Sequence, residues 1–310
     1  MVSNMEAYIL VILASCIFGS NFLFDNQYQR RAGSGLQSSM IHALIGSALG
    51  IVALLIVNFF MNGMILSVKF VPAAIIIAIF ASLNSLLYTV CSLRALGIIN
   101  LSLYSVFAML GGMVLPSILG MIITDPATGL REPFTVAKAV CFVLITIALL
   151  FTVQKGNGKK GAIYYAGVFV LNGMSGVFST LVTNFTYTPD KATADAISTG
   201  YSIATGIISL VISATAVIIF IAKKQKSTVS PTAFAFAASG GVLNRIANFI
   251  LVIALTMGME SSVQYPIVTG VVMIASTLLC YLTPEKPKVR DLISVAFAFA
   301  GVIALLLIPV

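Results

Sequence analysis

The chain has 310 residues, of which 59% are hydrophobic and only 8% are charged, and its mean hydropathy is +1.09. Soluble domains carry about 25% charged residues, so this composition excludes a water-soluble fold. The net charge of +8 does not indicate a nucleic-acid partner, because the basic residues stand in short clusters between apolar segments.

Ten apolar segments follow one another along the chain, and each is long enough to cross a bilayer. A stretch of about 18 or more apolar residues with few charges is typical of a transmembrane helix. The links between the segments are short and leave no room for a soluble domain. We therefore expect an all-α integral membrane protein with ten transmembrane helices, at residues 5–24, 36–61, 70–93, 98–123, 134–153, 161–183, 196–222, 232–257, 260–282 and 290–308.

The basic residues are distributed unequally between the links. Twelve lie on the side of the links that follow odd-numbered segments, whereas four lie on the other side, which includes both ends of the chain. Short cytoplasmic loops are enriched in lysine and arginine. The asymmetry predicts that the odd links are cytoplasmic and that both ends of the chain lie outside.

The chain divides into two related halves at the polar, glycine-rich and basic link 154–160. The predicted repeats are residues 1–153 and 161–310. In each half an Ala-Leu pair ends the third segment, a serine follows after five residues, a proline lies in the fourth segment, and a glutamate precedes the fifth. These residues are Ser102, Pro116 and Glu132 in the first half and Ser261, Pro266 and Glu285 in the second. Because five segments are an odd number, the halves must insert in opposite orientations, and inverted repeats around a central site are a transporter architecture.

These features resemble the drug/metabolite transporter (DMT) superfamily, in its EamA-type branch. The resemblance covers essentially the whole chain, and FGSN at 18–21 is similar to the family's aromatic-Gly-Ser step, with Phe where Trp is usual. It implies a central cavity lined by helices 1, 3, 4, 6, 8 and 9, and transport of small polar metabolites. It also implies cytoplasmic termini, which conflicts with the charge count. We expect a multi-pass protein of the plasma membrane.

Arg245 stands in the middle of the eighth segment, between Asn244 and Asn248. An arginine at mid-bilayer costs at least about 2.5–3.5 kcal/mol, and at a rise of about 1.5 Å per residue both helix ends are too far for its side chain to reach. It should therefore face protein or water. The leading hypothesis is an anchor for a substrate carboxylate or phosphate. A structural arginine bonded to carbonyls and asparagines, or a misassigned loop, are the alternatives.

Further polar residues fall on other segments that should line the cavity. A single polar residue in a membrane helix often holds neighbouring helices together, but their concentration on these segments favours substrate contact for some of them. His42 stands alone in the second segment and is interpreted as a packing or interface residue. The small residues of GSALG at 46–50 indicate close helix packing, with a dimer face as the alternative. The predicted substrate-binding residues are Arg245, Asn244, Asn248, Asn21, Asn84, Tyr88, Asn172, Tyr104, Gln264 and Tyr265.

No acidic residue is expected in the middle of a helix: Asp25 and Glu260 fall at helix ends, and Glu6 lies at the very start of the first segment. Proton-coupled export of cations generally uses a carboxylate within the membrane, so the sequence favours an anionic or zwitterionic solute: an amino acid, an organic anion or a nucleotide-like metabolite. The alternative is a proton-coupled exporter of organic cations or drugs that uses Asp25 or Glu260.

Other classes of membrane protein have less support. The chain has no HExxH motif and no cluster of acids for Mg²⁺, so we expect no enzyme, catalytic residue, metal or cofactor. No P-loop is present, which favours a secondary transporter working by alternating access. A sensor would share this composition, and solute flux separates it from a transporter. The expected partners are a small-molecule substrate, the lipid bilayer and a coupling ion, with no nucleic acid.

Overall fold

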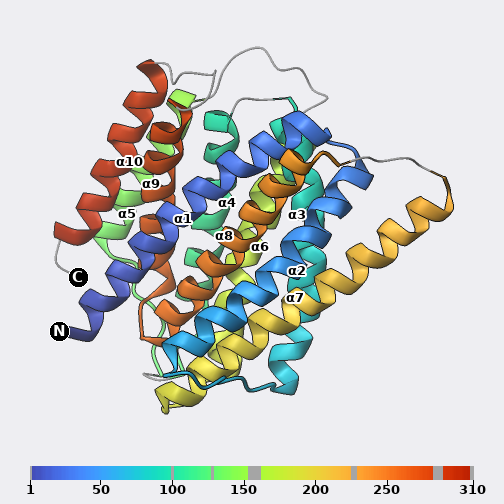
Figure 1. Ribbon diagram of the computed structural model, residues 1–310. Coiled ribbons are helices and arrows are strands. Elements are labelled where there is room, and N and C mark those ends of the chain that lie inside the picture. Colours follow the sequence, from blue (N-terminus) through green and yellow to red (C-terminus); the bar gives the residue numbers. More distant parts are fainter. Residues whose placement is uncertain are drawn as a thin grey trace.

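The computed structural model describes residues 2–98, 101–126, 129–152, 162–224, 229–281 and 289–307. The predicted link 154–160 and Glu285 lie outside these ranges. Within them the chain folds into ten helices joined by short connections (Figure 1), and each helix overlaps one of the ten predicted segments. The helices are α1 (Val2–Ala32), α2 (Leu36–Met61), α3 (Pro72–Leu96), α4 (Leu101–Ile122), α5 (Val136–Thr152), α6 (Ala162–Phe185), α7 (Lys191–Ala222), α8 (Pro231–Thr256), α9 (Ser261–Cys280) and α10 (Val289–Leu307).

The outer surface of this bundle suits lipid. Seven helices in the described ranges are long and apolar enough to cross a membrane: α1, α2, α3, α6, α7, α8 and α9. Their outward faces carry large apolar side chains that are more than half exposed, such as Val52, Ile76 and Val211. A helix satisfies its backbone hydrogen bonds internally, which is what a lipid environment demands. The chain is therefore an all-α, multi-pass membrane protein.

Helix α1 is longer than the sequence predicted, and this changes the position of Asp25. The apolar pattern ends at Phe24, but the polar residues that follow are helical as far as Ala32. They contain no helix breaker until Gly33, whose φ of 79° ends the helix. The expectation that Asp25 lies at a helix end was wrong, since it lies inside α1 and is only 6% exposed.

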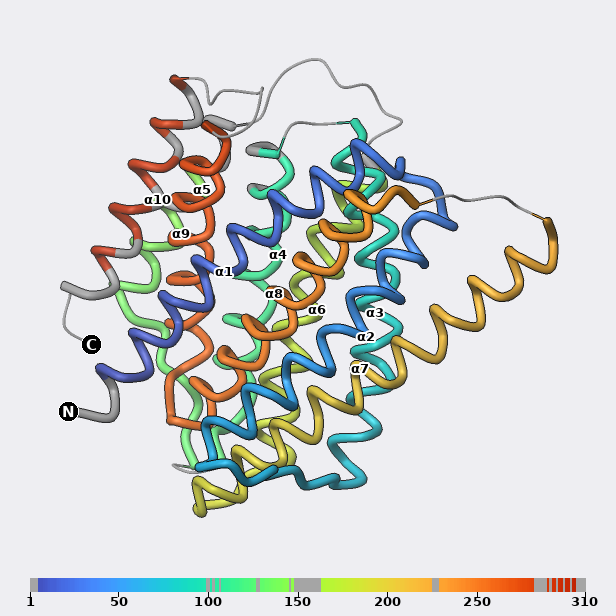
Figure 2. Tube along the Cα trace, viewed as in Figure 1, coloured from blue at the N-terminus to red at the C-terminus, as the bar shows by residue number. Residues whose placement is uncertain are grey.

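The helices pack in pairs that join the first half of the chain to the second. Helix α1 lies against α8 and α9, α4 against α6 and α9, and α3 against α6 and α7; α2 contacts α7 and α8, and α5 contacts α10. The traces of α1 and α8 run side by side through the molecule, with α5, α9 and α10 at one flank and α2, α3 and α7 at the other (Figure 2).

Glycines allow the closest of these approaches. A Cβ added to Gly46 of α2 would lie 3.0 Å from Gly241 Cα of α8, so the two backbones meet directly. One turn later a Cβ on Gly50 would lie 2.5 Å from Arg245 Cγ. These contacts confirm that the small residues at 46–50 serve close helix packing.

Candidate functional site

A cavity of about 130 Å³ lies among α1, α2, α3, α6, α7 and α8. The resemblance implied helices 4 and 9 in place of 2 and 7, and in the described part of the chain α4 and α9 contribute no lining residue. Hydroxyl and amide side chains supply most of the polar surface, including Ser85, Thr89, Ser175 and Thr205. A cavity lined in this way within a membrane bundle can hold a small, hydrogen-bonding solute.

Arg245 reaches this cavity from the interior of α8 and is half-buried. Gly50 of α2 leaves room for the arginine stem, and a Cβ on Gly206 of α7 would lie 3.9 Å from the guanidinium carbon. Among the residues that the structure describes, no carboxylate pairs with Arg245 and no hydrogen bond holds its guanidinium. Its five N–H donors therefore remain available to a solute in the cavity.

The two asparagines beside Arg245 also line the cavity, but they bond to each other. Asn248 Nδ2 donates to the Asn244 backbone carbonyl at 2.9 Å and to its side-chain oxygen at 2.5 Å. The structural alternative for Arg245 required bonds from the guanidinium to such groups. None is formed in the described ranges, so the arrangement favours the hypothesis of an anion anchor.

Three more predicted residues line the cavity: Asn21, Tyr88 and Asn172. Asn172 Nδ2 donates to the Ala108 carbonyl of α4 at 2.6 Å, which fixes the amide between α4 and α6. The hydroxyl of Tyr88 shares a hydrogen bond of 2.6 Å with that of Tyr104. The structure thus brings six of the ten predicted residues to one cavity.

The other four predicted residues lie outside the cavity and are bonded elsewhere. Asn84 donates to the Leu171 carbonyl and the Ser175 hydroxyl at 2.8 and 3.0 Å. Gln264 donates to the Leu251 carbonyl at 3.2 Å, Tyr265 donates to the Gly176 carbonyl at 3.0 Å, and Tyr104 shares its hydroxyl with Tyr88 and Ser92. These bonds join neighbouring helices. The substrate-binding role of all ten residues stays a prediction.

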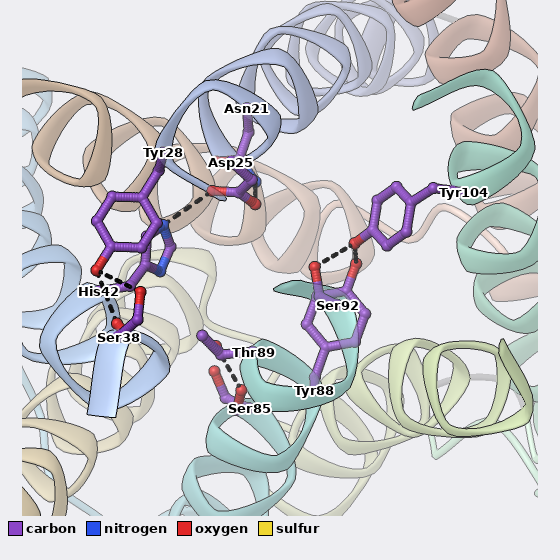
Figure 3. A network of polar contacts seen from close by, with 10 residues as sticks. All are labelled: Asn21, Asp25, Tyr28, Ser38, His42, Ser85, Tyr88, Thr89, Ser92 and Tyr104. Carbon is purple, nitrogen blue, oxygen red and sulfur yellow. Dashed lines mark hydrogen bonds and ion pairs between the residues drawn. The ribbon is translucent and has the colours of Figure 1, made fainter. Parts of the chain in front are cut away.

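A carboxylate–imidazole pair that the sequence reasoning missed joins α1 to α2 (Figure 3), and its imidazole, that of His42, lines the cavity. His42 Nε2 of α2 is 3.0 Å from Asp25 Oδ1 of α1, and Asn21 Nδ2 donates to Asp25 Oδ2 at 3.4 Å. The His42 ring packs on that of Tyr28 with centroids 4.7 Å apart. His42 is therefore more than the packing or interface residue that the sequence suggested. Its being the chain's one histidine was the only signal for it.

Figure 3 also shows the tyrosine pair opposite this carboxylate. The Tyr104 hydroxyl of α4 bonds to the hydroxyls of Tyr88 and Ser92 of α3 at 2.6 and 2.7 Å. Tyr104 packs edge-on against Phe22 of α1, with ring centroids 5.2 Å apart. The cluster orients Tyr88 so that it forms part of the cavity wall.

A second polar cluster lies where α4 and α8 end and α9 begins. The Glu132 carboxylate accepts hydrogen bonds from the Ser261 and Ser262 backbone N–H groups at 2.8 and 2.9 Å and from the Ser261 hydroxyl at 2.9 Å. Nearby, the buried ammonium of Lys138 on α5 pairs with Glu260 at 2.6 Å. A negative charge at a helix N-terminus is favourable, so residues of the first half hold the start of α9 in place.

Comparison with known proteins finds a similar fold but no match in sequence. No family model and no curated protein matches the sequence. A solved structure described only as "Crystal structure of protein" superposes with a TM-score of 0.67, over 96% of this chain and 95% of that one, at 16% sequence identity. At this identity the likeness concerns the fold alone, and the chain shares that fold along nearly its whole length.

Proposed function

We propose that the protein is a secondary transporter that moves a small polar metabolite across the plasma membrane through the central cavity. The substrate is an anionic or zwitterionic solute: an amino acid, an organic anion or a nucleotide-like molecule. The observation that carries the proposal is Arg245, a cation inside a membrane helix whose guanidinium faces a polar cavity without a carboxylate partner in the described chain.

The energetics of Arg245 support this substrate class. A guanidinium at the centre of a membrane protein is unfavourable unless it faces water or a counter-charge. A carboxylate or phosphate bound bidentately supplies both the charge and the hydrogen-bond acceptors that the guanidinium lacks. The surrounding hydroxyls and amides can bond to the other polar groups of the solute, as in other sites that combine one charged anchor with a few oriented polar groups.

The pairing of helices supports a transporter with two inverted five-helix repeats and ten transmembrane helices. If the two halves are related, each helix of α1–α5 corresponds to the helix five places later in α6–α10. Under this correspondence the contact of α1 with α8 becomes that of α6 with α3, and the contact of α1 with α9 becomes that of α6 with α4. Both members of each pair occur, and α2 with α7, α4 with α9 and α5 with α10 map onto themselves. A two-fold relation of this kind permits alternating access, in which one repeat rocks against the other. The proposal places the chain with the EamA-type drug/metabolite transporters.

The test is ligand binding and flux with one named solute of each class. Purified protein is heated with L-glutamate, succinate or adenosine monophosphate, and the transition temperature is compared with that in buffer. We expect at least one of these anions to stabilise the wild type and to be transported into proteoliposomes. Arg245→Gln should lose both effects, because the neutral amide cannot pair with the anion.

Arg94→Gln is the matched control. Arg94 also lies in a membrane helix, but its guanidinium is held by the Tyr164 hydroxyl at 3.1 Å and does not line the cavity. This variant should keep stabilisation and flux. Stabilisation that survives in Arg245→Gln would return Arg245 to a structural role and refute the proposal.

One observation favours the second candidate, a proton-coupled exporter of organic cations. Asp25 is a buried acid inside α1, where the sequence predicted none. Glu260, the other acid considered, is engaged by Lys138. Tetraethylammonium separates the candidates: stabilisation by this cation that is lost in Asp25→Asn and kept in Arg245→Gln would support the exporter.

A further inference from the structure

The Asp25–His42 pair can hold one proton or two, and binding of a substrate at Arg245 does not by itself require such a group. Both residues are less than 10% exposed, they belong to different helices, and His42 Nε2 lies 3.0 Å from Asp25 Oδ1. A carboxylate can only accept, so this contact needs a proton on His42 Nε2 or on Asp25 itself. If Nε2 carries it, a second proton on Nδ1 is optional; if Asp25 carries it, the neutral imidazole holds its own proton on Nδ1, and the pair has two protons.

The number of protons fixes the charge of the pair. With one proton the pair carries a net charge of −1, and with two it is neutral. Arg245 is the only residue with a permanent charge among those that line the cavity in the described chain. The pair and Arg245 together therefore have a net charge of 0 with one proton and +1 with two.

An anion that enters the cavity changes this balance. A monoanion bound beside Arg245 leaves the site at −1 when the pair holds one proton and neutral when it holds two. Charge inside a low-dielectric bundle is unfavourable unless it is compensated. Binding of the anion therefore favours uptake of a proton by the pair, and by linkage the proton favours the anion equally.

We propose that the Asp25–His42 pair is a proton-binding site whose occupancy is coupled to binding of an anion at Arg245. Histidine is the side chain that most readily changes charge near neutral pH, and a direct imidazole contact suits a proton better than an alkali-metal ion, which prefers oxygen ligands. The coupling rests on the proposed function, whereas proton binding by the pair does not.

The groups around the pair leave its charge to be set by protons and by the cavity. Tyr28 lies against the His42 ring, and Asn21 contacts the carboxylate. Gly240 of α8 presents bare backbone, and a Cβ there would lie 2.9 Å from Asp25 Oδ1. On the other helices, the titratable or charged groups that line the cavity in the described chain are Tyr88 on α3, Tyr201 on α7 and Arg245 on α8, and Tyr104 on α4 bonds to Tyr88; none of them is a carboxylic acid.

The first experiment needs no substrate, because the chain has a single histidine. Protein labelled with [¹⁵N]histidine in lipid nanodiscs gives the NMR signals of one imidazole. We expect these signals to change from the neutral to the charged form as the pH is lowered, and this change to be altered in Asp25→Asn. An imidazole that keeps one form throughout, or a titration identical in Asp25→Asn, would overturn the proposal.

The second experiment measures coupling with L-glutamate, succinate or adenosine monophosphate. Binding should be accompanied by uptake of about one proton, and the dissociation constant should fall up to about tenfold per unit decrease in pH. His42→Gln keeps a donor for Asp25 and should still bind the anion, but without proton uptake or pH dependence. Binding in the wild type without proton uptake would overturn the coupling.

Asp195→Asn is the matched control. Asp195 lies in α7, accepts a hydrogen bond from the Thr256 hydroxyl at 3.0 Å and does not line the cavity. It should leave the imidazole titration and the proton uptake unchanged. If none of the anions binds while the imidazole titrates as expected, the proton site stands and the proposed anion transporter fails.

Discussion

Replacing Glu132 with alanine tests how strongly the two halves of the chain are held together. The change removes a carboxylate that accepts three hydrogen bonds at the start of α9 and leaves two backbone N–H groups without that acceptor. Loss of a helix cap costs about 0.5–2 kcal/mol, and loss of the favourable charge at the helix N-terminus costs about 0.3–1 kcal/mol. We expect Glu132→Ala to lower the free energy of unfolding by about 1–3 kcal/mol.

The assay is equilibrium unfolding in mixed micelles with sodium dodecyl sulfate. Asp190→Ala is the matched control, because Asp190 caps α7 through Thr193 in the same way but is exposed, and within the described chain no hydrogen bond joins its side chain to another helix. Its loss should destabilise the protein less. Equal effects of the two changes would refute the reasoning that Glu132 holds α9 against the first half.

Three further outcomes follow from single contacts. Gly46→Ala should lower the free energy of unfolding by about 1–3 kcal/mol, because the new methyl group would lie 3.0 Å from Gly241 Cα. This loss exceeds the gain from the higher helix propensity of alanine, and the same unfolding assay measures it. Hydrogen bonds from Thr193 hold the pKa of Asp190 below its ordinary value. The ionised form therefore stabilises the fold at neutral pH, and this stabilisation is lost as the pH falls below 3.8. The free energy of unfolding of Asp190→Asn, measured at about pH 3 and pH 6, should depend less on pH than that of the wild type. Tyr104→Phe should lower thermal stability, since its two hydroxyl partners lose a bond, but should keep stabilisation by an anion.

The helices were predictable from the sequence because lipid imposes a simple rule. A segment that crosses a bilayer must be apolar over its length and must pair its own backbone groups. The same rule singled out Arg245, whose charge is unfavourable anywhere except at a cavity or a counter-charge. A long apolar segment, and a single charge within one, can both be recognised from a short stretch of the sequence alone.

Contacts between distant residues were not predictable in this way. Asp25 was placed at a helix end because the apolar pattern stops at Phe24, although the polar residues beyond it are compatible with a helix. Its partner His42 lies on another helix, and no spacing in the sequence joins the two. Conversely, Gln264 and Tyr104 have the residue types of ligand-binding groups, but packing gives them partners on neighbouring helices.

Arg245 is proposed to bind the transported anion, and flux into proteoliposomes is the direct test of this role. Uptake of labelled L-glutamate, succinate and adenosine monophosphate is measured for the wild type, Arg245→Gln and Arg94→Gln at equal protein density. We predict uptake of at least one of these solutes by the wild type and Arg94→Gln, and a loss of at least about tenfold in Arg245→Gln, which corresponds to about 1.4 kcal/mol. Equal uptake by wild type and Arg245→Gln, or uptake of tetraethylammonium alone, would contradict the claim.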